Sequence, residues 1–160
     1  MQQTLLILLF SIFSLIKTGD RTYGNYTLSV SEKNQIQKNT KGLSKAEIIE
    51  YCLKHTSKKL HFSKKNNINN GEANCVGYSQ YYASICNYSF NVNGISNCSC
   101  KPVVGYINLC GINLCKFAKS MVPADLKNFV KDHDFIEYTN NDKTIYFDPL
   151  IYDYTEGLMK

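Results

Sequence analysis

The sequence predicts an α+β domain in which helices pack against an antiparallel sheet. Apolar residues recur at helical spacing after Ser44 and again after Asn74, whereas the β-rich runs FIEY and TIYF follow one another near the end of the chain. With 160 residues and 44% hydrophobic content, the chain is long enough for one domain with a real core and too short for two comfortable ones.

Residues 1–19 are predicted to be a signal peptide or an N-terminal anchor. The stretch from Leu5 to Ile16 is an uncharged run of apolar and hydroxyl residues, which has the size of a signal-peptide h-region. It is too short to span a bilayer, since a spanning helix needs about 20 residues. No Lys or Arg precedes the run and no A-x-A cleavage site follows it, so an uncleaved membrane anchor and a buried N-terminal helix are kept as alternatives. We expect a secreted, periplasmic or cell-surface protein.

Residues 20–42 are rich in Asn, Lys, Ser and Thr, and we expect them to form a polar tether that leads to a folded domain over residues 43–160. The domain begins with a helix, because Ser44 and Glu47 form a capping-box pattern ahead of an apolar stripe. The stripe faces the core with Ile48, Ile49, Cys52 and Leu53. We expect this helix to end near Lys59 or one turn earlier.

The stretch NGEANCVGYSQYYASICNY, residues 70–88, predicts a second helix with a cysteine at its start. Asn74 is a good N-cap, which makes Cys75 the first helical residue. A thiol there lies where the helix dipole and unbonded backbone N–H groups favour a thiolate, and the same groups can stabilise an oxyanion. Gly77 costs a helix about 1 kcal/mol relative to Ala, so we expect another backbone or a substrate to approach it closely. The residues expected to face inward are Tyr78, Tyr82, Ile85 and Cys86.

Two elements are predicted between this helix and the end of the chain. The run KPVVGYINL has the composition of a strand, and VPADLKNFVKDH predicts a short helix that Pro123 begins. The inward side of that helix is expected to carry Leu126, Phe129 and Val130. It leads to His133, the only histidine that follows Cys75 in the sequence.

The segment HDFIEYTNNDKTIYFDP predicts a hairpin that turns at the two asparagines after Thr139, because asparagine tolerates the left-handed conformation of a two-residue turn. Pairing about that turn sets His133 directly opposite Asp148, and Phe135 opposite Tyr146. Opposed side chains have Cβ atoms about 4.5 to 5.5 Å apart, close enough for a carboxylate to accept a hydrogen bond from an imidazole. Such a bond orients the ring and stabilises its protonated form.

These motifs, in this order, resemble the transglutaminase-like core of the papain-like cysteine enzyme superfamily. The resemblance rests on NCVGYS at a helix start, a β region, His133 with an aromatic residue two positions on, and Asp148 before a proline after a short hairpin. It covers roughly residues 43–151. Two positions depart from the family pattern: Ala73 stands where a Gly commonly precedes the cysteine by two, and Phe135 where a Trp commonly follows the histidine. These departures put the fit of substrate in doubt more than the chemistry.

The resemblance implies a Cys-His-Asp triad, with Cys75 as nucleophile, His133 as general acid/base and Asp148 as orienting carboxylate. It implies a papain-like core and acyl transfer on peptide or isopeptide amide bonds through a thioester. The partner is then a protein or peptide substrate. We expect hydrolysis more than crosslinking, because the sequence shows neither an EF-hand-like calcium loop nor the extra domains of the large animal crosslinking enzymes.

The seven cysteines suit an exported protein with one reactive thiol. Apart from Cys75 they are Cys52, Cys86, Cys98, Cys100, Cys110 and Cys115. An even remainder predicts disulfide bonds, and the group from Cys98 to Cys115 is the best candidate for two bridges, with the pairing left open. A zinc site made of the same four thiolates is the weaker alternative, since structural zinc sites more often use C-x2-C pairs. We predict no metal and no cofactor.

The charge of the chain says little about partners. A net charge of +5 comes from 18 basic and 13 acidic residues, and the lysines are scattered through polar stretches. No nucleic-acid-binding motif accompanies them, so we predict a solvated surface and no nucleic-acid partner. Contact with a membrane is expected only through an uncleaved N-terminal segment, and the oligomeric state is left open.

Two other functions are kept as alternatives. A catalytically inactive member of the same fold, secreted and stapled by disulfides, would bind peptide or cell-wall material in the same cleft, and its Cys75 would be unreactive. A disulfide-stapled interaction protein with an accidental triad would instead have Cys75 in a bridge.

Overall fold

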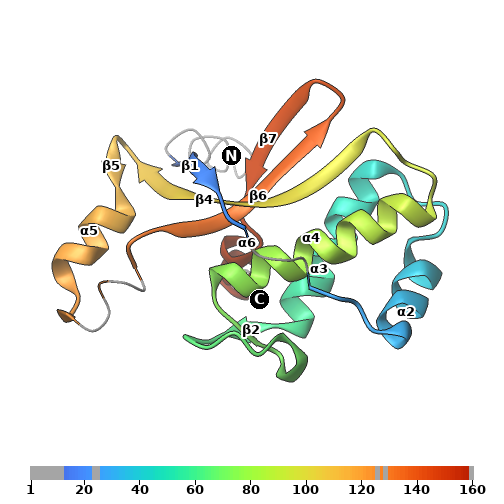
Figure 1. The fold of residues 1–160 in the computed structure, drawn as a ribbon, viewed down its shortest axis with the longest axis horizontal. Helices are drawn as coiled ribbons and strands as arrows, with labels where there is room; N and C mark the ends of the chain where they lie inside the picture. The colour runs from blue at the N-terminus through green and yellow to red at the C-terminus, as the bar shows by residue number, and fades with distance from the viewer. Residues whose placement is uncertain (1–12, 23–25, 125–126, 128–129, 159–160) are drawn as a thin grey trace.

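An antiparallel sheet forms one layer of the protein, and helices gather on one side of it (Figure 1). The computed structural model describes residues 13–22, 26–124, 127 and 130–158. The strands follow the order β1–β4–β6–β7, and a short β5 pairs with the end of β4. Their bounds are β1 (Phe13–Asp20), β4 (Cys98–Leu109), β5 (Ile112–Asn113), β6 (His133–Asn140) and β7 (Lys143–Phe147). The α+β class with helices against an antiparallel sheet is therefore confirmed.

Helix α4 (Cys75–Val92) is the centre of the packing. It packs against β4 and β6 of the sheet and, on its other side, against helix α3 (Lys45–Lys59). The four residues predicted to face inward are all fully buried, and so are Tyr81 and Ala83. A helix that buries more than one face is apolar almost all round, which fits the tyrosine-rich, uncharged sequence of α4.

Helix α3 begins at the predicted capping box. The Glu47 N–H donates to Ser44 Oγ at 3.4 Å, and the Ser44 N–H donates to Glu47 Oε2 at 2.8 Å. Ile48 and Cys52 are fully buried, as the apolar stripe predicts. The C-terminal helix α6 (Pro149–Leu158) packs against both α3 and α4, so the three helices form one cluster.

The prediction of a polar tether over residues 20–42 is wrong for its second half. Residues 30–40 form helix α2 (Val30–Thr40), which packs against α4 and buries Ile36 completely. The helix has a capping box between Ser29 and Glu32, a signal that the sequence contains. It was missed because α2 carries a single large buried apolar residue in an otherwise polar helix, which gives almost no helical periodicity.

The predicted signal peptide or anchor over residues 1–19 falls partly outside the described residues, which start at 13. Within it, residues 13–19 belong to strand β1, which pairs with β4 from Phe13 opposite Leu109 to Asp20 opposite Val103. A bulge interrupts this pairing between Lys17 and Gly19. Among the described residues, no helix is long and apolar enough to cross a membrane.

The predicted hairpin of β6 and β7 exists, but its register is shifted by two residues. The turn residues are Asn141 and Asp142, since Asn140 pairs with Lys143 and Ile136 with Phe147. Asn141 adopts the left-handed conformation with φ of 51°, so the turn chemistry was right and its position was wrong by one residue. A shift by two residues returns each side chain to the same face of the sheet.

Asn140 explains why the turn begins one residue later than predicted. It is the last residue of β6 in the ladder with β4, opposite Cys98, and its side-chain oxygen accepts from Lys45 Nζ at 3.1 Å. Both contacts come from distant parts of the chain, and they hold Asn140 in the strand. As a result, Phe135 is not opposite Tyr146, although their rings meet edge to face at 5.7 Å.

The far end of β4 carries an element that the sequence analysis did not predict. After the turn and β5, residues 114–121 form helix α5 (Leu114–Met121), which lies apart from the other helices (Figure 1). The predicted helix after Pro123 lies largely outside the described residues, because 125–126 and 128–129 are among those not described. Pro123 itself follows the end of α5 and lies in neither a helix nor a strand.

Candidate active site

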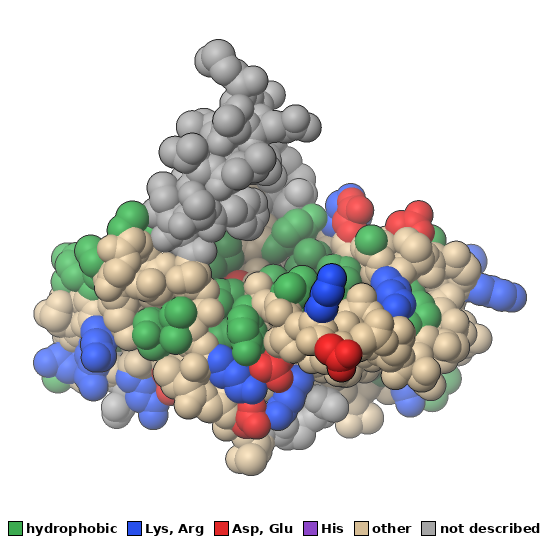
Figure 2. All heavy atoms as spheres, turned by 90° about the horizontal axis from the view of Figure 1, so that it is seen from above, with side chains coloured by type: hydrophobic (Ala, Val, Ile, Leu, Met, Phe, Trp, Pro, Cys, Tyr) green, Lys and Arg blue, Asp and Glu red, His purple; other side chains and the backbone are tan. Residues whose placement is uncertain are grey.

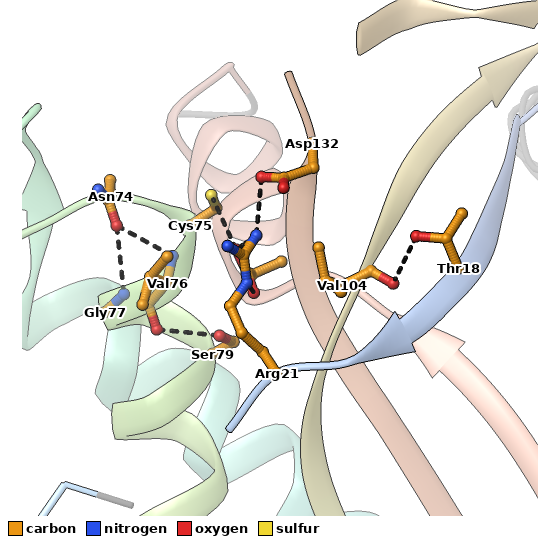
Figure 3. A network of polar contacts seen from close by, with 10 residues as sticks. Thr18, Arg21, Asn74, Cys75, Val76, Gly77, Ser79, Val104 and Asp132 are labelled. Carbon is orange, nitrogen blue, oxygen red and sulfur yellow. Dashed lines mark hydrogen bonds and ion pairs between the residues drawn. The ribbon is translucent and has the colours of Figure 1, made fainter. Parts of the chain in front are cut away.

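Cys75 is the first residue of α4, where the predicted N-cap fixes the backbone. Asn74 Oδ1 accepts from the Val76 N–H at 3.0 Å and from the Gly77 N–H at 3.4 Å (Figure 3). The side chain of Cys75 is partly exposed, unlike the fully buried residues of the next turns. The N-cap therefore presents the thiol at the positive end of the helix dipole, as predicted.

The loop before Cys75 is held by an asparagine that the sequence analysis did not assign. Asn66 Oδ1 accepts from the Asn74 N–H at 2.9 Å. A Cβ built on Gly77 would lie 2.7 Å from Ala73 Cβ and 2.8 Å from Asn66 Oδ1. The close approach expected at Gly77 is thus made by the protein's own loop, and a larger residue there would push the loop and the nucleophile apart.

The same loop is tied to the end of α3 by a two-stranded parallel ladder. Strand β2 (His61–Phe62) pairs with β3 (Glu72–Ala73), and a short 3-10 turn, η1 (Ile68–Asn70), lies between them. The loop ahead of the nucleophile is therefore anchored at both ends by backbone hydrogen bonds.

His133 and Asp148 form the predicted hydrogen bond in spite of the shifted register. The bond joins His133 Nε2 and Asp148 Oδ2. Residue 148 lies diagonal to His133 on the same face of the hairpin, within reach of a long side chain. The predicted contact between His133 and Asp148 forms in spite of the wrong register, because a shift of two residues leaves each side chain on the same face of the sheet.

Asp148 is fixed on its other oxygen as well. Its Oδ1 accepts from the Leu150 N–H at 2.8 Å and from the Ile151 N–H at 3.3 Å, so it caps the N-terminus of α6. The residue is only 7% exposed. A buried carboxylate with both oxygens bonded holds the imidazole in one orientation, which is the role predicted for it.

The surroundings of His133 favour its protonated form. Burial lowers the pKa of His133, but the hydrogen bond and charge of Asp148, together with the hydrogen bond and charge of Cys75, outweigh it and raise the pKa well above its ordinary value. The ring also stacks on Phe135, with ring centroids 6.5 Å apart. The structure therefore brings Cys75, His133 and Asp148 together.

A second set of charges surrounds Cys75 and was not predicted. Cys75 Sγ donates to Asp134 Oδ2 at 3.8 Å, and this carboxylate is 1% exposed. Arg21, which follows β1, binds Asp134 through two nitrogens. It binds Asp132 through one (Figure 3). Sequence patterns gave no sign of this contact, because Arg21 and Asp134 lie 113 positions apart.

Cys75 and His133 open onto a pocket of about 250 Å³. Most of its lining is apolar and comes from Phe62, Ile107, Leu114, Ala118, Val130 and Leu150. Asp132 is its acidic member, and the largely buried Cys115 of α5 adds a second thiol. The unpredicted helix α5 thus supplies one wall of the pocket beside the nucleophile.

All seven cysteines are free thiols, and their placement corrects the grouping predicted for them. Cys98 and Cys100 lie at one end of β4, while Cys110 and Cys115 lie beyond the other. About 30 Å of extended strand separates the two pairs, so they can neither bridge one another nor share a zinc ion. Among the described residues, no group of three or more His, Cys, Asp or Glu side chains is arranged to hold a metal.

Three cysteines meet instead in the core. Cys86 of α4 interacts with Cys52 of α3 and with Cys100 of β4, and all three are almost fully buried. Burial, with the hydrogen bond to Cys86, raises the pKa of Cys52. The backbone at Cys100 is held to α4 by Asn87, which both accepts from its N–H and donates to its carbonyl at 2.8 Å. These thiols pack the interface between helices and sheet, and disulfide formation stays a prediction.

The surface seen in Figure 2 carries lysine and acidic side chains interspersed with polar ones, without one large basic field on that face. Apolar side chains reach the surface at the end of the molecule where α5 and β5 lie. They include Ile112, Phe117 and Met121, each more than half exposed.

The chain was compared with known proteins. No family model matches it, and no curated protein and no solved structure matches it either.

Proposed function

We propose that this protein is a cysteine-dependent acyl-transfer enzyme with a transglutaminase-like, papain-like core that acts on peptide or isopeptide bonds. The observation that carries the proposal is the contact series from Cys75 to His133 to Asp148. A thiol at a helix N-terminus, an imidazole in contact with it and a buried carboxylate behind the imidazole are the three parts that nucleophilic cysteine chemistry needs.

In the proposed reaction, the Cys75 thiolate attacks the amide carbonyl carbon while His133 holds the proton. The carbonyl oxygen becomes an oxyanion, for which the Cys75 backbone N–H is the proposed donor, since those of Val76 and Gly77 already donate to Asn74. The C–N bond then breaks, and the leaving amine takes the proton from His133. A thioester on Cys75 remains.

Water completes the reaction that we favour. His133 takes a proton from the water as its oxygen attacks the thioester carbon, and the acid is released as the sulfur leaves. A lysine amine in place of water would give a crosslink. The mostly apolar pocket beside Cys75 supports an acyl group with an apolar side chain.

One contact favours a second candidate, a catalytically inactive member of the same fold that binds peptide or cell-wall material. Asp134 accepts a hydrogen bond from the Cys75 thiol, and a carboxylate in that place favours the protonated sulfur. An inactive protein would keep the cleft and lack a reactive thiolate.

Alkylation separates the two candidates. The unreduced protein is treated with iodoacetamide from about pH 5 to 9, and mass spectrometry locates the modified cysteines. Cys110 is exposed and serves as an internal reference for a thiol that the reagent can reach. For an enzyme we expect Cys75 to react about 10-fold faster than Cys110 near pH 6, where ordinary thiols are mostly protonated. The His133→Gln variant should lose that advantage.

Turnover is tested with a peptide mixture of random sequence, read by mass spectrometry for cleaved bonds and, with an added primary amine, for amine-tagged products. Cys110→Ala is the matched control, since it removes an exposed thiol that does not line the pocket and should keep activity. The proposal is wrong if Cys75 reacts like Cys110 at every pH and its reactivity is unaffected by His133→Gln.

A further inference from the structure

Asp134 creates an electrostatic problem for the proposed chemistry. Its carboxylate is buried, and its Oδ2 lies 3.8 Å from Cys75 Sγ. A negative charge at that distance, with little water between, opposes the formation of a second negative charge on the sulfur. Taken alone, Asp134 would suppress the thiolate that attacks a substrate.

Arg21 supplies the opposing charge. Its Nε lies 2.9 Å from Asp134 Oδ1, its Nη2 lies 3.0 Å from Asp134 Oδ2, and the same Nη2 lies 2.7 Å from Asp132 Oδ1. Arg21 is the only arginine in a sequence with 18 basic residues. A guanidinium binds a carboxylate through two parallel bonds, which the single ammonium of a lysine cannot do.

The N-terminal strand positions this arginine. Strand β1 pairs with β4 up to Asp20, opposite Val103, and Arg21 is the next residue. Figure 3 shows the Arg21 side chain extending from the end of β1 into the space between α4 and the start of β6. Residues 13–21, part of which the sequence assigns to a leader segment, therefore support the candidate site.

We propose that Arg21 is a positioning residue for the cysteine chemistry: it neutralises Asp134, so that this carboxylate does not suppress the Cys75 thiolate. The inference rests on the proposed function, because it concerns the reactive form of Cys75. It assigns Arg21 no contact with the substrate.

Other charged groups near Cys75 also affect its ionisation, and the test leaves them unchanged. The titratable and charged groups around it are Arg21 after β1, Asp132 before β6, His133 and Asp134 of β6, Cys115 of α5 and, through His133, Asp148. Only the Arg21–Asp134 pair is changed in the test.

The test measures the pH profile of Cys75 alkylation in four proteins. Arg21→Gln should move the midpoint of the profile upward by about one pH unit, because Asp134 loses the positive charge of the guanidinium. Asp134→Asn should move it downward, and the double variant should return close to the wild-type midpoint. Lys17→Gln is the matched control: Lys17 lies on the same strand and binds Glu137 of β6 at 2.8 Å, and the substitution should leave the profile unchanged.

Two results would overturn the inference. One is an Arg21→Gln profile that coincides with that of Lys17→Gln, and the other is a double variant as strongly shifted as Arg21→Gln alone. If Arg21→Gln does not fold, the comparison of Asp134→Asn with the double variant decides: a lower midpoint in Asp134→Asn supports the inference, and equal midpoints overturn it. His133→Gln in the same series keeps the two proposals apart. If the alkylation profile of Cys75 changes in His133→Gln but not in Arg21→Gln, only the inference is rejected. If it changes in neither variant, the proposed function is rejected.

Discussion

Helix α4 carries two cysteines in opposite surroundings. Cys75, in its first turn, is partly exposed and contacts the ionisable residues His133 and Asp134. Cys86, three turns later, is fully buried, and its partners are the thiols of Cys52 and Cys100 and the hydroxyl of Tyr82. One residue type on one helix therefore serves two purposes, because charge surrounds the first turn and the packed core surrounds the rest.

The difference lies in the groups that surround each thiol. At the helix start, these are the helix dipole, an imidazole and a carboxylate. In the core, burial raises the pKa of Cys86, and its hydrogen-bonding neighbours Cys100, Cys52 and Tyr82 outweigh it and lower the pKa without supplying a positive charge. The candidate nucleophile and the core thiol are separated along the helix by about 16 Å of rise.

The largest expected effect is that of replacing Cys75, the candidate nucleophile, on the rate of peptide-bond cleavage. Cys75→Ala should lower the rate of peptide-bond cleavage by at least about 10⁴-fold, because it removes the nucleophile, and should leave the melting temperature nearly unchanged. Cys86→Ala is the matched variant on the same helix. It should keep the rate and lose about 1 to 2 kcal/mol of unfolding free energy, since it opens a small cavity in the core.

Cleavage assays and urea denaturation of both variants check this pair of expectations. A Cys86→Ala protein that is stable but inactive would contradict the division of roles. So would a Cys75→Ala protein that retains activity.

The reactive end was the more predictable of the two regions, because its signals are local. The N-cap at Asn74 and the cysteine after it are adjacent in sequence, and a turn signal brings His133 and Asp148 to one face of a hairpin. The exact register was not predictable from these signals, since Asn140 is held in β6 by distant residues. The site survived this error because side chains alternate with a period of two.

The support around that site was not predictable. Arg21 reaches Asp134 only because β1 pairs with β4, and an apolar run followed by charged residues describes a leader equally well. Helix α5 has only eight residues and follows a turn, so its pattern is too short to separate it from a loop. Contacts between segments far apart in the chain leave no mark on a single sequence.

Substitutions in α2, the helix that the sequence analysis missed, test the packing around the buried part of α4. Ile36 of α2 is fully buried in the core, whereas Val30 of the same helix is 75% exposed. Ile36→Ala should lower the unfolding free energy by about 2 to 5 kcal/mol, because the lost methyl and methylene groups leave a cavity. Val30→Ala should change it by less than about 0.5 kcal/mol.

Chemical denaturation of the two variants gives both values. Equal and small effects would mean that α2 contributes little to the core, as expected of a tether. Cys75 alkylation should keep its wild-type profile in both variants, since neither residue lines the pocket beside Cys75.

The smallest effect concerns the charge on His133, and it is best measured in Cys75→Ala, where the thiol no longer titrates. Asp148 is the first of the groups that raise the pKa of His133, and it is still present in this variant. We therefore expect the folded protein to keep a proton which the unfolded chain releases near pH 6.5. This stabilisation is complete below that pH and is lost as the pH rises through the folded-state pKa. Above pH 6.5 the unfolding free energy should therefore decrease by up to about 1.4 kcal/mol per pH unit.

The Asp148→Asn variant, in the same Cys75→Ala background, isolates the cause of that slope. It keeps an oxygen that can accept from the backbone N–H groups at the start of α6, and it removes the charge that His133 faces. Urea denaturation at several pH values should then show a weaker dependence above pH 6.5. An unchanged slope would assign the pH dependence to groups other than His133 and Asp148. It would contradict the view that Asp148 stabilises the protonated form of His133.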